Sequence, residues 1–162
     1  MTQLDQAISP VMAPPLPLPL VTVNTTEGLP LPTGMGPFLI YVSIQTVAGK
    51  SKPVFSLSSD TSSASTWYTS ITWTAVAGTG LTNMLFSYVT SSDYTIEGFI
   101  SRSNALTFVN MRSNSANATG SCVVVPKTQQ NYAFCVNFTV GSQSSQCEDP
   151  HIVVTPPGSN DE

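Results

Sequence analysis

The chain carries little charge. Lys and Arg together contribute five of its 162 residues, Asp and Glu contribute nine, and the formal net charge is −4. A nucleic-acid-binding surface needs clustered Lys and Arg to neutralise phosphates, so the composition argues against nucleic acid as a partner. Weak charge also lowers the electrostatic repulsion between copies of the chain, which favours self-association.

Long hydrophobic runs are also missing. A membrane-spanning helix needs roughly 20 consecutive apolar residues, and the most apolar stretch, 38–47, is interrupted by Tyr41, Ser43, Gln45 and Thr46. The opening Met-Thr-Gln-Leu-Asp-Gln lacks the basic segment followed by an apolar segment that marks a secretory signal. We therefore expect no membrane partner, and a place in the cytoplasm, outside the cell after release without a signal, or in a virion.

Groups that could carry out catalysis are scarce. His151 is the only histidine, no Gly-x-Ser-x-Gly turn occurs, and no Cys or His pair has zinc-ligand spacing. In the stretch Glu148-Asp149-Pro150-His151, neighbours in extended backbone point to opposite faces, which disfavours both a metal site and a Ser-His-Asp relay. The sequence predicts a protein that is not an enzyme and that has no cofactor and no metal.

The N-terminal part of the chain is rich in proline. From residue 9 to residue 37 the proline density excludes helix and favours extended backbone. Alternate positions in this stretch carry leucine, namely Leu16, Leu18, Leu20, Leu29 and Leu31. We expect residues 1–37 to form an extended Pro-rich arm that lies on its own domain or on that of a neighbouring copy.

From residue 38 onward, apolar and polar residues alternate in short segments separated by Gly, Ser, Asn and Asp. This pattern is typical of an antiparallel all-β domain. The predicted strands are 38–47, 53–57, 66–76, 83–90, 94–101, 105–111, 121–125, 131–140 and 152–155. Their number and spacing predict that residues 38–162 form an antiparallel, jelly-roll-like β-sandwich.

Three cysteines cannot all pair within one chain. If 125–131 is a hairpin with its loop at 127–130, Cys122 lies opposite Cys135, at a separation close to that of a disulfide. The alternative is two reduced thiols in a cytosolic protein. Cys147 stays free in both cases, and its acidic neighbours argue against a nucleophile.

Aromatic and polar residues near the strand ends suggest a sugar-binding site, because a tyrosine ring can stack on a pyranose while amides and carboxylates bind its hydroxyls. The candidate ligand-binding residues are Tyr68, Asn83, Tyr88, Asp93 and Tyr94. The alternative interpretation places Tyr88 in the core with Met84 and Phe86 and the other tyrosines at strand edges.

The segment Asn131-Tyr132-Ala133-Phe134, Phe138 and the stretch Asp149-Pro150-His151-Ile152-Val153-Val154 resemble the C-terminus of the bacterial inclusion body (AidA/PixA) family. Residues 71–73 and 84–88 look like the middle strands of that family. The resemblance covers about the last third of the chain and one hairpin. It implies a compact β-sandwich that accumulates in inclusions inside a bacterial cell, with no catalytic residues to carry over.

These observations lead to one main hypothesis and two alternatives. The main hypothesis is a non-catalytic protein that self-associates into a homo-oligomer, as an inclusion-body-like or assembly protein. The first alternative is a lectin-like module with a glycan ligand. The second is a capsid, spike or fibre domain of a virus or phage, since such domains are also β-rich, rich in Ser and Thr, and equipped with arms.

Overall fold

The computed structural model describes residues 21–34, 36–75, 81–103, 105–113, 118–126 and 130–155. Within these ranges every regular element is a strand, which confirms the all-β class, and there is no helix that could cross a membrane. The strands are β2 (Thr22–Asn24), β3 (Leu29–Pro30), β4 (Phe38–Val47), β5 (Lys50–Ser56), β6 (Thr66–Tyr68), β7 (Ile71–Thr74), β8 (Leu81–Tyr88), β9 (Tyr94–Ser101), β10 (Val109–Arg112), β11 (Ala118–Pro126), β12 (Gln130–Val140), β13 (Gln146–Glu148) and β14 (His151–Thr155).

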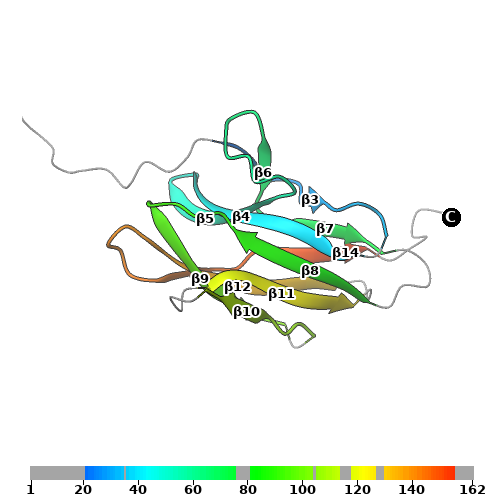
Figure 1. Ribbon diagram of the computed structural model, residues 1–162. Helices are drawn as coiled ribbons and strands as arrows, with labels where there is room; N and C mark the ends of the chain where they lie inside the picture. The colour runs from blue at the N-terminus through cyan, green and yellow to red at the C-terminus, as the bar shows by residue number, and fades with distance from the viewer. Residues whose placement is uncertain are drawn as a thin grey trace, which may run out of the picture.

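The strands form two sheets (Figure 1). The seven-stranded sheet has the order β10-β11-β8-β4-β5-β6-β2. The six-stranded sheet has the order β13-β12-β14-β7-β3, and β9 also pairs with β12. In Figure 1 the cyan β4, the green β8 and the yellow β11 run side by side.

Both sheets are mixed, so the expected antiparallel pairing holds for only part of the domain. The parallel pairs are β4 with β8, β2 with β6, β3 with β7, and β7 with β14. Parallel neighbours cannot be joined by a tight hairpin and require a crossover. The chain supplies such crossovers by changing sheets between consecutive strands, as from β7 to β8 and from β8 to β9.

Part of the expected arm belongs to the sheets. Leu29 and Leu31 are buried, and their backbone N–H groups donate to the carbonyl oxygens of Ser70 at 2.8 Å and Thr72 at 3.0 Å. Pro30 has no N–H to donate, but the bonds to β7 come from the N–H groups of its two neighbours. Proline is tolerated at such a position of an edge strand. Residues 22–24 and 29–30 of the expected arm thus pair with the sheets, while residues 1–20 and 35 lie outside the described part of the chain.

One hydrophobic core is built from residues of both sheets. At its centre, Phe86 of β8 meets Phe99 of β9 with ring centroids 4.9 Å apart, and Phe99 meets Phe134 of β12 at 5.3 Å. Each such aromatic pair contributes about 0.5–1.5 kcal/mol beyond the burial of its area. These rings join the two sheets at their centre.

The predicted strand 66–76 is two strands in different sheets. β6 belongs to the seven-stranded sheet and β7 to the six-stranded sheet, with Thr69 and Ser70 between them. Trp73 therefore lies in the main core, whereas Trp67 is buried outside it and donates its indole N–H to the carbonyl oxygen of Asp60 at 3.0 Å. The alternating pattern continues across the break, so alternation alone could not reveal the change of sheet.

An asparagine side chain links the edges of the two sheets. The Asn110 side chain on β10 accepts a hydrogen bond from the Phe99 N–H at 2.9 Å and donates one to the Phe99 carbonyl oxygen at 3.2 Å. The amide thus pairs with β9 as a neighbouring strand would. Gly98 permits this approach, because a Cβ there would lie 2.9 Å from the Asn110 amide nitrogen.

The cysteine pairing differs from the prediction. β11 pairs with β8 and β10, and β12 pairs with β9, β13 and β14, so the expected hairpin between β11 and β12 does not form. Cys122 and Cys135 consequently lie in different sheets. The structure instead joins Cys135 to Cys147 in a disulfide, with Cα atoms 5.5 Å apart, and leaves Cys122 free.

Candidate functional site

A row of apolar side chains crosses the outside of the seven-stranded sheet. Val109 of β10 is directly opposite Cys122 of β11, Cys122 is opposite Leu85 of β8, and Leu85 is opposite Leu39 of β4. Directly opposed residues share one face of a sheet. Since Phe86 is in the core and side chains alternate along a strand, this row lies on the face turned away from the core. We call it, with Val124 and Met111, the outer apolar face.

Large apolar side chains of the outer apolar face are exposed to solvent. Leu39, Leu85 and Val109 expose 46%, 38% and 58% of their surface. The next rows add Val124 opposite Asn83, and Met111 at the edge strand β10. None of these residues carries a charge. A contiguous exposed apolar patch on a β-sheet usually marks an interaction surface, because it gains stability only when another surface covers it.

The face contains an open depression of about 300 Å³. Its lining includes the apolar Leu85, Val109 and Val124, the thiol of Cys122, and the polar Asn83 and Thr107. Most of the lining is therefore apolar, and the polar groups available for orienting a ligand are few. The shape and chemistry fit a protruding apolar side chain better than a small polar molecule.

A second hollow is lined by tyrosines and hydroxyls. It measures about 260 Å³, and its lining includes Tyr88, Thr90, Ser91, Tyr94, Thr95 and Thr119. Tyr88 ends β8 and Tyr94 begins β9, so the short connection between these strands brings both rings to one place. We call this hollow the tyrosine pocket.

Hydrogen bonds hold both tyrosine hydroxyls. The Tyr88 hydroxyl bonds the Ser121 hydroxyl, which donates to Asn110 Oδ1 at 2.6 Å. The Tyr94 hydroxyl donates to the Val89 carbonyl oxygen at 3.0 Å and lies 3.1 Å from the hydroxyl of Ser43.

The tyrosine pocket is uncharged at neutral pH. Burial raises the pKa of Tyr88 to about 12, against a smaller lowering by the Ser121 hydrogen bond. Burial likewise raises the pKa of Tyr94, opposed in part by its bond to Ser43. Both hydroxyls therefore stay protonated and act as neutral hydrogen-bonding groups.

The structure brings together only some of the predicted ligand-binding residues. Tyr88 and Tyr94 line the tyrosine pocket, and Asp93 precedes Tyr94 in the turn, half-buried. Tyr68 is on β6, packed against the core, and Asn83 lines the depression on the outer apolar face. Tyr88 shares the core face of β8 with Met84 and Phe86, as the alternative interpretation held.

Sequence reasoning missed the outer apolar face. Its signal was present in 81–88, where Leu85 lies between two core residues, Met84 and Phe86, so that both faces of the strand carry large apolar side chains. The row itself needs the register of four strands, which are far apart in the sequence. No local pattern could have placed Leu39, Leu85 and Val109 side by side.

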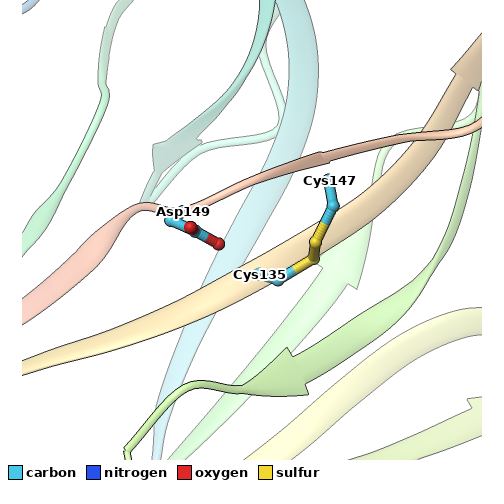
Figure 2. Close-up of side chains that lie close together, drawn as sticks. All are labelled: Cys135, Cys147 and Asp149. Carbon is cyan, nitrogen blue, oxygen red and sulfur yellow. A yellow bond between two sulfur atoms is a disulfide. The ribbon is translucent and has the colours of Figure 1, made fainter.

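One cluster of side chains with metal-ligand chemistry lies at the six-stranded sheet. Within the described part of the chain, the candidate ligand atoms of Cys135, Cys147 and Asp149 all lie within 4.8 Å of one another (Figure 2). Arg102 Nε is 3.3 Å from Asp149 Oδ1. His151, the single histidine, is exposed and outside this group.

No protein-family model matches this chain, and no curated protein matches it either.

Proposed function

We propose that this protein is a non-catalytic, jelly-roll-like β-sandwich that self-associates through its outer apolar face. The observation that carries the proposal is the uncharged row of Val109, Cys122, Leu85 and Leu39 across four strands. Covering such a row removes apolar surface from water at about 25 cal/mol per Å². The occupant that we propose is the same face of a second copy.

A second copy fits this face for two reasons. In a two-fold pairing the same patch is used twice, so a face without charged side chains meets another without charged side chains and no charge is buried unpaired. The chain as a whole, with five basic and nine acidic residues, offers weak electrostatic opposition to such contact.

The Pro-rich N-terminal arm is part of the same proposal. Residues 1–20 precede β2, which lies at the opposite edge of the seven-stranded sheet from β10. If fully extended, they span at most about 70 Å, enough to reach a neighbouring copy. Leu16, Leu18 and Leu20 supply apolar side chains for that contact. Removing residues 1–20 is expected to weaken the assembly and to leave the sheets folded.

Sedimentation velocity of the full chain over a range of concentrations tests the proposal. Leu85→Asp places a charge in the centre of the outer apolar face. Leu57→Asp is the matched control, because Leu57 exposes a similar 43%, follows β5 and is not one of the residues that form the face. We expect Leu85→Asp to raise the dissociation constant about tenfold or more, equivalent to about 1.4 kcal/mol or more. Equal sedimentation of both variants and the unchanged chain would overturn the proposal.

A lectin-like module is the second candidate, supported by the tyrosine pocket. Tyr88 and Tyr94 expose only 9% and 5% of their surface, and Tyr88 already stacks on Phe99 with centroids 5.6 Å apart. A glycan would therefore contact mainly the hydroxyls of Thr90 and Thr95. Loss of glycan-array binding in Thr90→Ala and in Thr95→Ala would favour this candidate, and an array without hits would reject it.

The form of the assembly separates the remaining possibilities. An inclusion-body-like protein, in line with the AidA/PixA resemblance, is expected to give dense intracellular bodies when expressed. A capsid, spike or fibre domain is expected to give regular particles or filaments under the electron microscope. A discrete small oligomer would support neither of these forms and would leave self-association itself intact.

A further inference from the structure

The outer side of the six-stranded sheet holds two cysteines and a carboxylate on neighbouring strands. Phe134 and Val136 point into the core, so Cys135 between them lies on the opposite face of β12. Cys147 of β13 is directly opposite Asn137, two residues further along β12. Asp149 follows two residues after Cys147, and Figure 2 shows its carboxylate directed toward the two sulfur atoms.

Solvent reaches Cys147 and Asp149 but not Cys135. Cys135 is fully buried, whereas Cys147 and Asp149 are exposed. A small ion could therefore reach the sulfur atoms from solvent past Cys147, while Cys135 forms the floor of the site. The ligand atoms lie within 4.8 Å of one another, so small side-chain rotations bring all three to one metal ion.

Arg102 forms hydrogen bonds with both Cys147 and Asp149. Its Nη2 donates to Cys147 Sγ at 3.0 Å, and its Nε donates to Asp149 Oδ1 at 3.3 Å. Hydrogen bonds of this kind orient metal ligands and compensate their charge. Two thiolates, one carboxylate and a divalent cation carry a net charge of −1 together, which the guanidinium of Arg102 offsets.

We propose that the reduced form of this protein binds one zinc ion through Cys135, Cys147 and Asp149. Zinc accepts thiolate sulfur and carboxylate oxygen in a four-coordinate site, and here the fourth position is left for water. The proposal is independent of the proposed self-association, because these residues lie on the other sheet from the outer apolar face.

Reduction must come before metal binding. A dithiol reductant gives two electrons and two protons to the Cys135–Cys147 bond and becomes a disulfide itself, which leaves two thiols on the protein. Zinc then displaces the two thiol protons. In the disulfide form neither sulfur is a thiolate, so the oxidised protein lacks two of the three ligands. The site thus binds metal only in a reducing environment.

Metal binding to the full chain, reduced with a phosphine that does not chelate zinc, tests the proposal. We expect one zinc ion per chain by elemental analysis after gel filtration. Cobalt in place of zinc is expected to give thiolate-to-metal charge transfer and the visible bands of a tetrahedral site. Absence of stoichiometric zinc in the reduced chain, or equal binding by the oxidised chain, overturns the proposal.

Variants assign the ligands. Cys147→Ser is expected to abolish stoichiometric binding, and Asp149→Asn, which keeps both cysteines and the fold of the oxidised protein, to weaken it at least about tenfold. Cys122→Ser is the matched control and is expected to bind as the unchanged chain does, because Cys122 is in the other sheet. Loss of binding in Cys122→Ser, or full binding in Asp149→Asn, contradicts the assignment.

Arg102 is a positioning residue in this site. Arg102→Gln removes the charge that offsets the ligands and is expected to weaken zinc binding by about 10- to 100-fold, with the cobalt spectrum keeping its tetrahedral bands. Unchanged affinity in Arg102→Gln would contradict this role.

Discussion

The outer surfaces of the two sheets differ in chemistry although their inner surfaces share one core. On the seven-stranded sheet the outward positions of β10, β8 and β4 carry Val109, Leu85 and Leu39. On the six-stranded sheet the corresponding outward positions of β12 carry Asn137 and Thr139, which are half-buried. In both sheets, alternate residues point into the core, so the core does not account for the difference between the outer surfaces.

Polar side chains on the outside of the six-stranded sheet form hydrogen bonds with one another. The Ser145 hydroxyl donates to Asn137 Oδ1 at 2.6 Å and is within 3.2 Å of Glu97 Oε1, and the Thr74 and Thr155 hydroxyls are 3.1 Å apart. Water can solvate what remains. The outer apolar face has few such groups, and covering it would remove apolar surface from water. This contrast is the basis for proposing assembly on one sheet and metal binding on the other.

The largest expected effect separates two neighbours on β8. Phe86→Ala empties the centre of the aromatic core and is expected to lower the free energy of unfolding by about 3–5 kcal/mol. Leu85→Ala, on the outer apolar face, is expected to change the unfolding free energy of the separated chain by about 0.5 kcal/mol or less. Urea denaturation at low protein concentration measures both, and similar losses in the two variants would refute the assignment of faces.

The next effect concerns the disulfide. Cys147→Ser opens the loop closed over 12 residues and is expected to lower the free energy of unfolding by about 2–4 kcal/mol, because the unfolded chain regains freedom. A domain of this kind has about 5–15 kcal/mol of stability, so the reduced chain stays folded. Cys122→Ser should leave the urea midpoint unchanged, and an equal loss in that control would contradict the observed pairing.

A smaller effect is expected at high pH. The pKa of Tyr88 is about 12 in the folded chain, above the usual value of 10.0, so the folded state holds its proton where the unfolded state releases it. This stabilisation is fully present below about pH 10 and is lost as the pH rises toward about 12. Tyr94 and Tyr132 act in the same direction.

Tyr88→Phe isolates the contribution of Tyr88. Ser121 keeps its bond to Asn110 in this variant, so no buried hydroxyl loses all partners. We expect the unfolding free energy to fall less steeply between about pH 10 and about pH 12 than in the unchanged chain. Equal slopes in urea titrations would show that Tyr88 does not contribute.

The smallest effect is expected on the polar surface. Asn131→Lys adds a charge at an exposed outward position of β12. We expect a change in unfolding free energy within about 0.5 kcal/mol and no change in self-association. A loss of association comparable to that of Leu85→Asp would remove the contrast between the two surfaces.

Much of the fold could be predicted from local pattern. The predicted strands 38–47 and 94–101 have the bounds of β4 and β9, because alternation is clear there and turn residues follow. At the end of β4, Ala48 and Gly49 have φ values of 52° and 82°, the conformation of a two-residue hairpin turn. Local chemistry decides such features.

Features that depend on pairing between distant segments could not be predicted. Cys122 opposite Cys135 followed from an assumed hairpin, but the chain crosses to the other sheet between β11 and β12. Cys147 became the partner because the short strand β13, which alternation did not reveal, pairs with β12. Tyr88 and Tyr94 lie together because only five residues of the chain separate them. No such short connection links Tyr68 or Asn83 to that place.

The reactivity of Cys122 tests the proposed assembly most directly. With the disulfide intact it is the free thiol of the chain, half-exposed in the centre of the apolar row. Its alkylation rate should fall as the protein concentration rises through the association range, and Leu85→Asp should abolish this dependence. An alkylation rate that is the same at all concentrations, in protein shown by sedimentation to associate, would mean that another surface forms the contact.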